Sequence, residues 1–454
     1  MYLLYSLLLT LGFVALLPRF AIDAMRSGKY VTGLRQRLGQ LPAINSTGKQ
    51  VIWLHCVSVG ETQAARSLVR ALRTEFPNHC LVVSTTTVTG QQVARKIFAN
   101  DAAIVFYFPV DLAWVVRRVL RALKPSAVLI METELWPRLL RECRARAIPV
   151  ALLNGRISGT SFRRYKLIRC FMRRVLNDLT IALMQSEKDA ARIRELGLPE
   201  ERIALPGNLK FDSAETAIDE RVTAELGRRF GFDGTQSLIV AASTHAPEER
   251  IAIGALQQMK HSDQSSRTRL LIAPRHPERF GEVGYLLEGS GLTWSRRSGE
   301  PGEHDTTCDV VLLDTVGELR SVYPLAQIVF VGGSIGAHGG HNMLEPAATG
   351  ACVITGPHTE NFAAVTKALL DEEALIQLPE PSPSDAPTQL ASVFTNLFSD
   401  QARRREMGLR AREACRKNAG ATERTMQMLS RILSRTTIVD PSLPLSALSV
   451  TAAK

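Results

Sequence analysis

The stretch VIWLHCVSVGE, residues 51–61, decides the fold expected for this chain. A continuous apolar run that stops at a glycine is typical of a strand buried in a parallel sheet. The TQAARSLVRALRTEF that follows repeats apolar residues at the spacing of an amphipathic helix. Ligands of open parallel sheets bind outside the carboxyl ends of the strands. We place Glu61 at such an end, so it is a candidate functional residue.

The same alternation of strand and helix runs twice along the chain. Strands separated by helices indicate a parallel, doubly wound α/β sheet. Since 454 residues exceed what one core usually serves, we expect two Rossmann-like domains that face a cleft. The predicted parts are an anchor at 1–22, domains at 23–212 and 213–430, and a disordered tail at 431–454. The apolar runs lie at 51–59, 80–87, 103–108, 126–133 and 149–154, then at 237–244, 269–276, 310–317, 328–334 and 352–357.

The N-terminal segment differs from the rest of the chain. Residues 2–17, YLLYSLLLTLGFVALL, carry no charge, although they are slightly short for a span of ~20 residues. Basic residues follow and outnumber Asp23, the one acid among them, so the positive-inside rule predicts an anchor with the main body in the cytoplasm. A helix that lies in the membrane interface is the alternative. The basic residues are Arg19, Arg26, Lys29, Arg35 and Arg37.

The net charge of +11 predicts an acidic partner, which could be nucleic acid, an anionic membrane or a phosphorylated substrate. Residues 161–174, SFRRYKLIRCFMRR, hold six cations and no acid, with apolar side chains between them. Two interpretations stay open, a solvated helix face that packs on the core and a membrane-binding surface. Seven dispersed cysteines indicate buried thiols in a reducing compartment.

Residues 332–357, GGSIGAHGGHNMLEPAATGACVITGP, are the densest chemical signal. Glycines after a strand let the backbone approach a ligand, and a helix start can bind phosphate. The stretch contains neither a P-loop nor a G-x-G-x-x-G fingerprint. Glu345 could accept hydrogen bonds from ribose hydroxyls, or it could simply favour the helix dipole.

Other strand ends and junctions add polar side chains. APRHP offers Arg275 and His276, and DTVGEL offers Gly317. The acids of DTVGEL, Asp314 and Glu318, are by themselves more typical of helix caps than of catalytic residues. GNLKFD places Lys210 where it can neutralise a phosphate, and METELWP contains Glu132 and Glu134. The chain has neither a D-x-D motif nor a histidine-containing metal spacing, so we expect no metal site. The first series of strand ends carries Glu61, Thr86, Thr87, Pro109, Glu132, Glu134, Asn154 and Arg156.

Seven motifs in order, SVGE, METELWP, LLNGR, GNLKFD, PRH, DTVGEL and GGHNMLEPAATG, carry a family resemblance. The chain resembles the Kdo transferases of lipopolysaccharide synthesis over roughly residues 1 to 420. The resemblance implies the GT-B fold, with an acceptor-side first domain and a CMP-sugar-binding second domain. It implies inverting transfer of 3-deoxy-D-manno-octulosonic acid (Kdo) from CMP-Kdo to the 6′-hydroxyl of the tetraacyl lipid A disaccharide precursor. It also implies the cytoplasmic side of a bacterial inner membrane, with no required metal or other cofactor and no nucleic-acid partner.

By motif, the resemblance also assigns residue roles. The catalytic base falls on Glu61, and the positions that stabilise the transition state fall on Glu132 and Lys210. The CMP contacts fall on Arg275, His276, Val316, Gly317, Glu318, Asn342, Met343, Leu344 and Glu345.

Two alternatives stay open. The fold also hosts nucleotide-sugar epimerases and transferases with a UDP donor, and fold does not fix function. The second alternative is a membrane-anchored scaffold that binds a nucleotide but has no enzymatic activity, although this alternative leaves Glu61 and Glu132 without a purpose.

Overall fold

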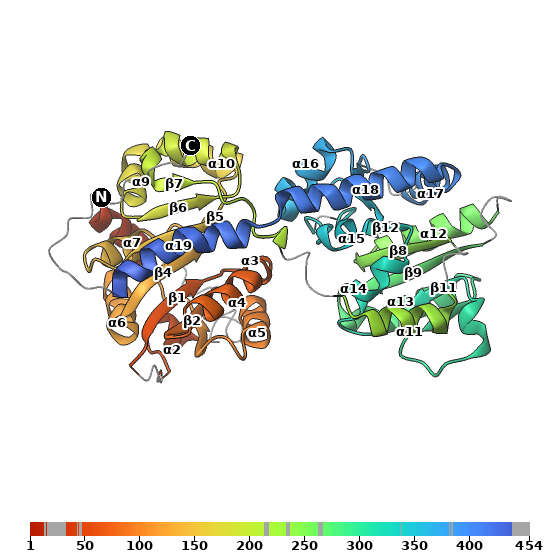
Figure 1. The fold of residues 1–454 in the computed structure, drawn as a ribbon, viewed down its shortest axis with the longest axis horizontal. Helices are drawn as coiled ribbons and strands as arrows, with labels where there is room; N and C mark the ends of the chain where they lie inside the picture. Colours follow the sequence, from red (N-terminus) through yellow and green to blue (C-terminus); the bar gives the residue numbers. More distant parts are fainter. Residues whose placement is uncertain are drawn as a thin grey trace. The chain divides into compact units, whose positions relative to one another are not determined.

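The computed structural model divides the chain into two compact units (Figure 1). Unit 1 comprises Met1–Ser213 and Ala419–Lys454, and unit 2 comprises Ala214–Asn418. The sequence predicted a second domain that continued to residue 430, whereas the chain returns to unit 1 at Ala419. The structure describes all residues except 13–14, 16–32, 43, 45–47, 213–217, 233–236, 262–266, 337, 381, 383–384 and 438–454.

Unit 1 contains a seven-stranded parallel sheet in the order β3-β2-β1-β4-β5-β6-β7. The strand order reverses between β1 and β4, which is the switch point where ligands of such sheets bind. The predicted doubly wound sheet is therefore confirmed. Its strands are β1 (Gln50–His55), β2 (His79–Thr85), β3 (Ile104–Tyr107), β4 (Pro125–Met131), β5 (Val150–Gly155), β6 (Ile181–Met184) and β7 (Ile203–Ala204).

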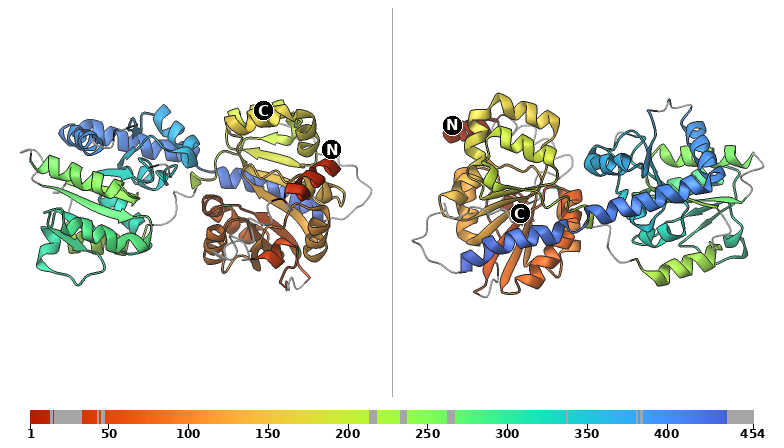
Figure 2. Two further views of the ribbon diagram at one scale, coloured as in Figure 1. Left: turned by 180° about the vertical axis from the view of Figure 1, so that it is seen from behind. Right: turned by 45° about the horizontal axis from the view of Figure 1, so that its top comes forward.

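Helices cover both faces of this sheet (Figure 2). One apolar core lies under α3 (Val59–Ala64), α4 (Arg66–Glu75), α5 (Val88–Ile97) and α19 (Ala421–Thr437). The other core lies under α6 (Ala113–Leu123), α7 (Pro137–Arg144), α9 (Arg169–Leu176) and α10 (Glu187–Leu196). Helix α19 buries Met426, Leu429 and Leu433 in the core that it shares with α3, α4 and α5, so this helix belongs to unit 1. The remaining helices are α2 (Leu34–Arg37) and α8 (Gly159–Leu167).

Unit 2 repeats the architecture with the strand order β10-β11-β9-β8-β12-β13-β14, again parallel throughout. Its switch point lies between β8 and β12. The strands are β8 (Ser237–Thr244), β9 (Thr268–Pro274), β10 (Trp294–Arg296), β11 (Val310–Leu312), β12 (Ile328–Val331), β13 (Cys352–Thr355) and β14 (Leu375–Gln377). The helices are α11 (Glu220–Phe230), α12 (Glu248–Lys260), α13 (Phe280–Glu288), α14 (Leu319–Val322), α15 (Leu344–Thr349), α16 (Ala363–Asp371), α17 (Ala386–Ser399) and α18 (Gln401–Asn418).

The N-terminal segment forms a helix over residues 2–12 that is docked on unit 1. The Tyr2 and Tyr5 hydroxyls donate to Asp178 and Asp111, and Arg138 donates to Ser6 Oγ at 2.6 Å. Residues 1–12 and 15 of the predicted anchor at 1–22 are described, and the described part of the chain contains no helix long and apolar enough to cross a membrane. The rest of that prediction, residues 13–14 and 16–22, lies outside the described residues.

Five of the six leucines of this helix are exposed and face away from unit 1. Leu3 is 82% exposed, and Leu4, Leu7, Leu8 and Leu11 are also more than half exposed. The ring of Phe171 in α9 lies 5.7 Å from that of Tyr2, which brings the basic run at 161–174 beside the helix. That run breaks into α8 and α9 around Leu167, which is 86% exposed. The exposed cations of the run are Arg163, Arg164, Lys166, Arg169, Arg173 and Arg174.

Candidate active site

Glu61 lies at the switch point of unit 1, but one element later than the sequence predicted. Strand β1 ends at His55 and α3 begins at Val59, so Glu61 occupies the first helical turn instead of the end of the strand. The cause is Ser58, whose side chain caps the helix. Glu61 Oε2 accepts from the Val57 N–H at 2.8 Å, and Oε1 accepts from Ser58 Oγ at 3.0 Å. These bonds fix a carboxylate whose residue is only 7% exposed.

The environment of Glu61 makes its carboxylate unusually basic. Burial, followed by the negative charge of Glu132, raises its pKa to about 8. Hydrogen bonds from Val57 and Ser58 oppose the rise without cancelling it. A carboxylate with this pKa accepts a proton from a hydroxyl much better than an ordinary glutamate does.

Glu132 and Lys210 form an ion pair at the end of β4. Lys210 Nζ lies 3.1 Å from Glu132 Oε1, and both side chains are largely buried. Glu132 has a left-handed backbone with φ 52°, which is uncommon for a residue with a Cβ atom and is held by its N–H bond to Leu153 O at 2.8 Å. The structure thus brings the three predicted catalytic residues to one edge of one sheet.

The loop that carries Lys210 is fastened to the end of β5. Asn154 Oδ1 accepts from the Leu209 N–H, and Asn208 Oδ1 accepts from the Lys210 N–H, each at 3.0 Å. Asn154 also has a left-handed φ of 52°. Burial, with the charge of Glu132 as a smaller cause, raises the pKa of the neighbouring Glu134. The carboxylates of Glu61, Glu132 and Glu134 are therefore close enough to influence one another, and Lys210 pairs with Glu132.

In unit 2, a buried carboxylate that the sequence did not reveal shapes the glycine-rich loop after β12. Glu248 is fully buried and accepts from the N–H groups of Gly333, Ser334 and Ile335 at 2.7–2.9 Å, and from that of His245 at 2.9 Å. No short motif could have identified it, because its partners are 85 to 87 residues away apart from His245. Glu248 fixes the backbone at the switch point of this sheet.

Four imidazoles gather at the same edge, namely His245, His276, His338 and His341. The Nε2 atoms of His245 and His341 lie 2.9 Å apart, so one donates and the other accepts. Burial and the neighbouring positive groups lower the pKa of His245 to about 4 and that of His341 to about 3. Only His276 was predicted as a site residue. His338 and His341 lie within the glycine-rich stretch 332–357, whereas His245 follows β8 and His276 follows β9, so the clustering of the four depends on the tertiary fold.

The residues predicted to bind the CMP-sugar donor lie at strand ends of unit 2, and they differ in exposure and in hydrogen bonding. Arg275 and His276 follow β9 and are exposed, as are Val316 and Gly317 after β11, where Gly317 has φ 101°. Glu318 accepts from Arg297 at 2.9 and 3.0 Å, and this bond is the first cause of its lowered pKa.

The last predicted group begins α15. Glu345 Oε1 accepts from Arg320 Nη2 at 2.5 Å and from Asn342 Nδ2 at 3.1 Å. Met343 and Leu344 are fully buried, and the Leu344 N–H donates to Asn342 Oδ1 at 3.1 Å. No group of histidine, cysteine and acidic residues in the described part of the chain is arranged to hold a metal ion.

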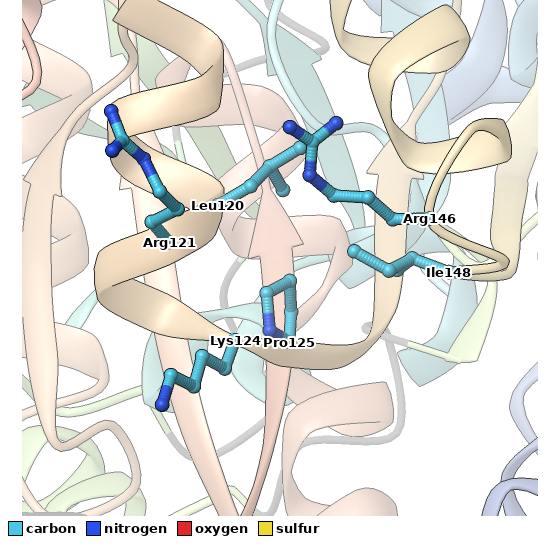
Figure 3. A pocket seen from close by; sticks show the side chains of 6 residues that line it. All are labelled: Leu120, Arg121, Lys124, Pro125, Arg146 and Ile148. Carbon is cyan, nitrogen blue, oxygen red and sulfur yellow. The ribbon is translucent and has the colours of Figure 1, made fainter.

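A pocket of about 550 Å³ lies at the opposite edge of the unit 1 sheet (Figure 3). Leu120, Arg121, Lys124, Pro125, Arg146 and Ile148 line it, at the end of α6 and the amino end of β4. Glu61 and Glu132 follow the carboxyl ends of β1 and β4. The pocket is therefore separate from the candidate site.

Comparison with known sequences gives consistent matches. The profile of a family described as "3-Deoxy-D-manno-octulosonic-acid transferase (kdotransferase)" matches residues 32–213. A 3-deoxy-D-manno-octulosonic acid transferase of Haemophilus influenzae is 32% identical over 95% of this chain and 98% of its own length. A protein of the same name from Bordetella pertussis is 36% identical over 83% of this chain and 86% of its own.

Comparison with solved structures shows the fold alone, because the identities are low. A putative UDP-N-acetylglucosamine 2-epimerase from Listeria monocytogenes has a TM-score of 0.55 at 13% identity, and the match covers 87% of this chain and 99% of that one. MurG of Acinetobacter baumannii has a TM-score of 0.54 at 12% identity, with coverage of 85% and 100%. The two parallel-sheet units are thus those of a GT-B-like fold.

Proposed function

The chain belongs to the Kdo transferase family of glycosyltransferases, and from this premise we propose that it moves Kdo from CMP-Kdo to the 6′-hydroxyl of the tetraacyl lipid A disaccharide precursor, with inversion. The observation that carries the proposal is the buried carboxylate of Glu61, with its pKa of about 8, next to the Glu132–Lys210 ion pair at a sheet switch point. A base of this strength suits a sugar hydroxyl.

In the proposed reaction, Glu61 acts as the general base. It takes the proton of the acceptor hydroxyl while the oxygen forms a bond to the anomeric carbon of Kdo. The bond between that carbon and the CMP phosphate oxygen breaks, and its electron pair leaves with CMP. A displacement on the face opposite the leaving group inverts the anomeric centre.

Glu132 and Lys210 supply charge in this proposal. The anomeric carbon gains positive character in the transition state, and the carboxylate of Glu132 stabilises it. The ammonium of Lys210 offsets the negative charge that develops on the departing phosphate. Their ion pair at 3.1 Å supports the assignment, because each group holds the other in place at the sheet edge.

We assign CMP recognition to the strand ends of unit 2. Arg275 and His276 are exposed and suit a phosphate, and the backbone of Val316 and Gly317 is accessible to a base or ribose. Glu318, Asn342 and Glu345 supply polar groups for ribose hydroxyls, and the buried Met343 and Leu344 hold the start of α15 in place beneath them. The glycine loop fixed by Glu248 gives this surface a rigid floor.

We also propose that unit 1 binds the cytoplasmic face of the inner membrane, where a lipid acceptor is available. Support comes from the docked N-terminal helix, whose leucines face outward, and from the exposed cations of α8 and α9 beside it. Outward leucines flanked by arginines match a helix that lies in an anionic interface.

Mass spectrometry of the lipid A precursor tests the function directly. The purified protein is incubated with the precursor, Kdo, CTP and an enzyme that regenerates CMP-Kdo. We expect a mass gain of one or more Kdo units, which also counts the additions. A folded preparation that binds CMP without any gain would favour the scaffold, and stronger competition by UDP than by CMP would favour a UDP-dependent enzyme.

A further inference from the structure

Arg37 lies at the same sheet edge as Glu61, and no role has been assigned to it so far. Its Nη2 donates to Thr86 O at 2.6 Å, and its guanidinium carbon lies 4.5 Å from the centroid of the Tyr107 ring. Thr86 follows β2 and Tyr107 ends β3. The sequence pattern indicates Arg37 only as one of the positive charges that follow the predicted membrane anchor. The structure places it at the ligand-binding edge of the unit 1 sheet.

The fold holds Arg37 at this place firmly. Gln36 Oε1 accepts from the Tyr107 N–H at 2.9 Å, and Arg37 O accepts from the Val110 N–H at 2.9 Å. Gly33 has φ 76°, and a Cβ atom there would lie 2.0 Å from Tyr107 Cδ2. A residue with a side chain at position 33 could not bring α2 this close to the end of β3.

Arg37 is half-buried, which makes its positive charge costly. Burial lowers its pKa, and Tyr107 is the group that opposes this. No carboxylate in the described part of the chain forms an ion pair with Arg37. A desolvated charge without a counter-charge is destabilising unless a ligand supplies one. The planar guanidinium group can donate two parallel hydrogen bonds to two oxygens of a phosphate.

A short hydrogen-bonded path connects Arg37 to Glu61. The N–H groups of Thr86 and Thr87 both donate to Val57 O at 3.3 Å, and the Val57 N–H donates to Glu61 Oε2. Because β2 pairs with β1 and neighbouring strands are roughly 5 Å apart, the Thr86 carbonyl that Arg37 contacts lies beside the loop that leads to Glu61. An acceptor whose hydroxyl meets Glu61 can therefore also reach Arg37.

We propose that Arg37 binds an anionic phosphate on the acceptor and so positions the hydroxyl that Glu61 deprotonates. This inference rests on the proposed function and adds a recognition element to it. Arg37 is a binding and positioning residue, because it contacts the acceptor away from the reacting atoms.

The test measures steady-state transfer by wild type, Arg37→Ala and Arg37→Lys, with the phosphorylated acceptor and with the same acceptor after phosphatase treatment. With the intact acceptor, we expect Arg37→Ala to raise KM for the acceptor about 10- to 100-fold. KM for CMP-Kdo should stay unchanged, and Arg37→Lys should recover part of the loss. With the phosphatase-treated acceptor, wild type and Arg37→Ala should be about equally slow, because the contact is already absent.

Arg35→Ala is the matched control, since Arg35 lies on the same short helix and is exposed. An equal loss with both acceptors would show that Arg37 only holds α2 in place and would overturn the proposal. A raised KM for CMP-Kdo would overturn it as well, because the anion would then belong to the donor. No turnover by wild type with either acceptor would instead contradict the proposed function.

Discussion

At the scale of single residues, Glu61 combines a structural and a proposed chemical role. Its carboxylate completes the cap of α3 through Ser58 and Val57, which explains its fixed orientation. A cap alone does not need a buried carboxylate with a pKa of about 8 beside Glu132. That combination is typical of active sites, where environments tune acids and bases.

Replacement of the proposed base separates the two roles. We expect Glu61→Gln to lower kcat about 10²- to 10⁴-fold, since general base catalysis contributes that much. CMP binding, measured by calorimetry, should be retained, as should the circular dichroism spectrum. Glu75→Gln at the exposed end of α4 is the control. Transfer by Glu61→Gln at near wild-type rate would remove Glu61 from the mechanism.

The raised pKa also predicts a pH profile. Glu61 must be ionised to act, so log kcat/KM should rise with pH up to about 8 and then level off. Burial is the main cause of the raised pKa and Glu132 the second, so Glu132→Gln should move this limb to lower pH as well as reduce the rate. If log kcat/KM of Glu132→Gln rises over the same pH range as that of wild type, the proposed electrostatic coupling of Glu132 to Glu61 is contradicted.

The raised pKa also links Glu61 to stability. The folded state holds the Glu61 proton more tightly than the unfolded state, in which the carboxyl has a pKa near the ordinary 4.5. Stability from this group is therefore complete below pH 4.5 and is lost as pH rises to about 8, by ~1.4 kcal/mol for each pH unit between the two pKa values. Urea unfolding at pH 6 and pH 9 should show a smaller loss for Glu61→Gln than for wild type. An equal loss in the two proteins would contradict the assigned pKa.

At the scale of elements, the long buried strands and the helices between them could be predicted from apolar periodicity. Strands β6, β7, β10 and β14, which have two to four residues, were not predicted. Length alone is not the reason, because β3, β11, β12 and β13 are equally short and were predicted from their apolar runs. The three predicted catalytic residues do meet at one edge. The histidine cluster and Arg37 could not be identified, since contacts between distant segments define them.

The N-terminal helix combines polar contacts with an exposed apolar side. Tyr2, Tyr5 and Ser6 make polar contacts with unit 1, whereas Leu3, Leu4, Leu7, Leu8 and Leu11 are exposed. Leu3→Glu with Leu7→Glu should therefore reduce sedimentation with anionic liposomes about tenfold, while soluble substrate analogues are still bound. Reversal of Arg163 and Arg169 to glutamate should act in the same direction, and more so at low salt. Liposome binding that survives both changes would exclude this surface.

At the scale of the whole molecule, α19 makes unit 1 discontinuous. Asp212 at the end of the first segment accepts from the N–H groups of Gly420 and Thr422, where the chain returns. A chain that ends at residue 418 should lower the unfolding temperature of unit 1 by several degrees or more, because Met426, Leu429 and Leu433 leave an exposed apolar face. Unit 2 should unfold as before, and a chain that ends at residue 437 is the control. Unchanged calorimetric transitions in the shorter chain would contradict this role of α19.

The discontinuity also sets an order of events on the ribosome. Domains usually complete their folding in the order in which they are synthesised. Here unit 2 is contiguous and can close first, whereas unit 1 waits for residues 421–437. At ~5–20 residues per second, the interval from the first segment of unit 1 to the emergence of α19 is roughly 10 to 45 s. During that time the nascent chain exposes the apolar face that α19 later covers, and this interval is when it most needs a chaperone.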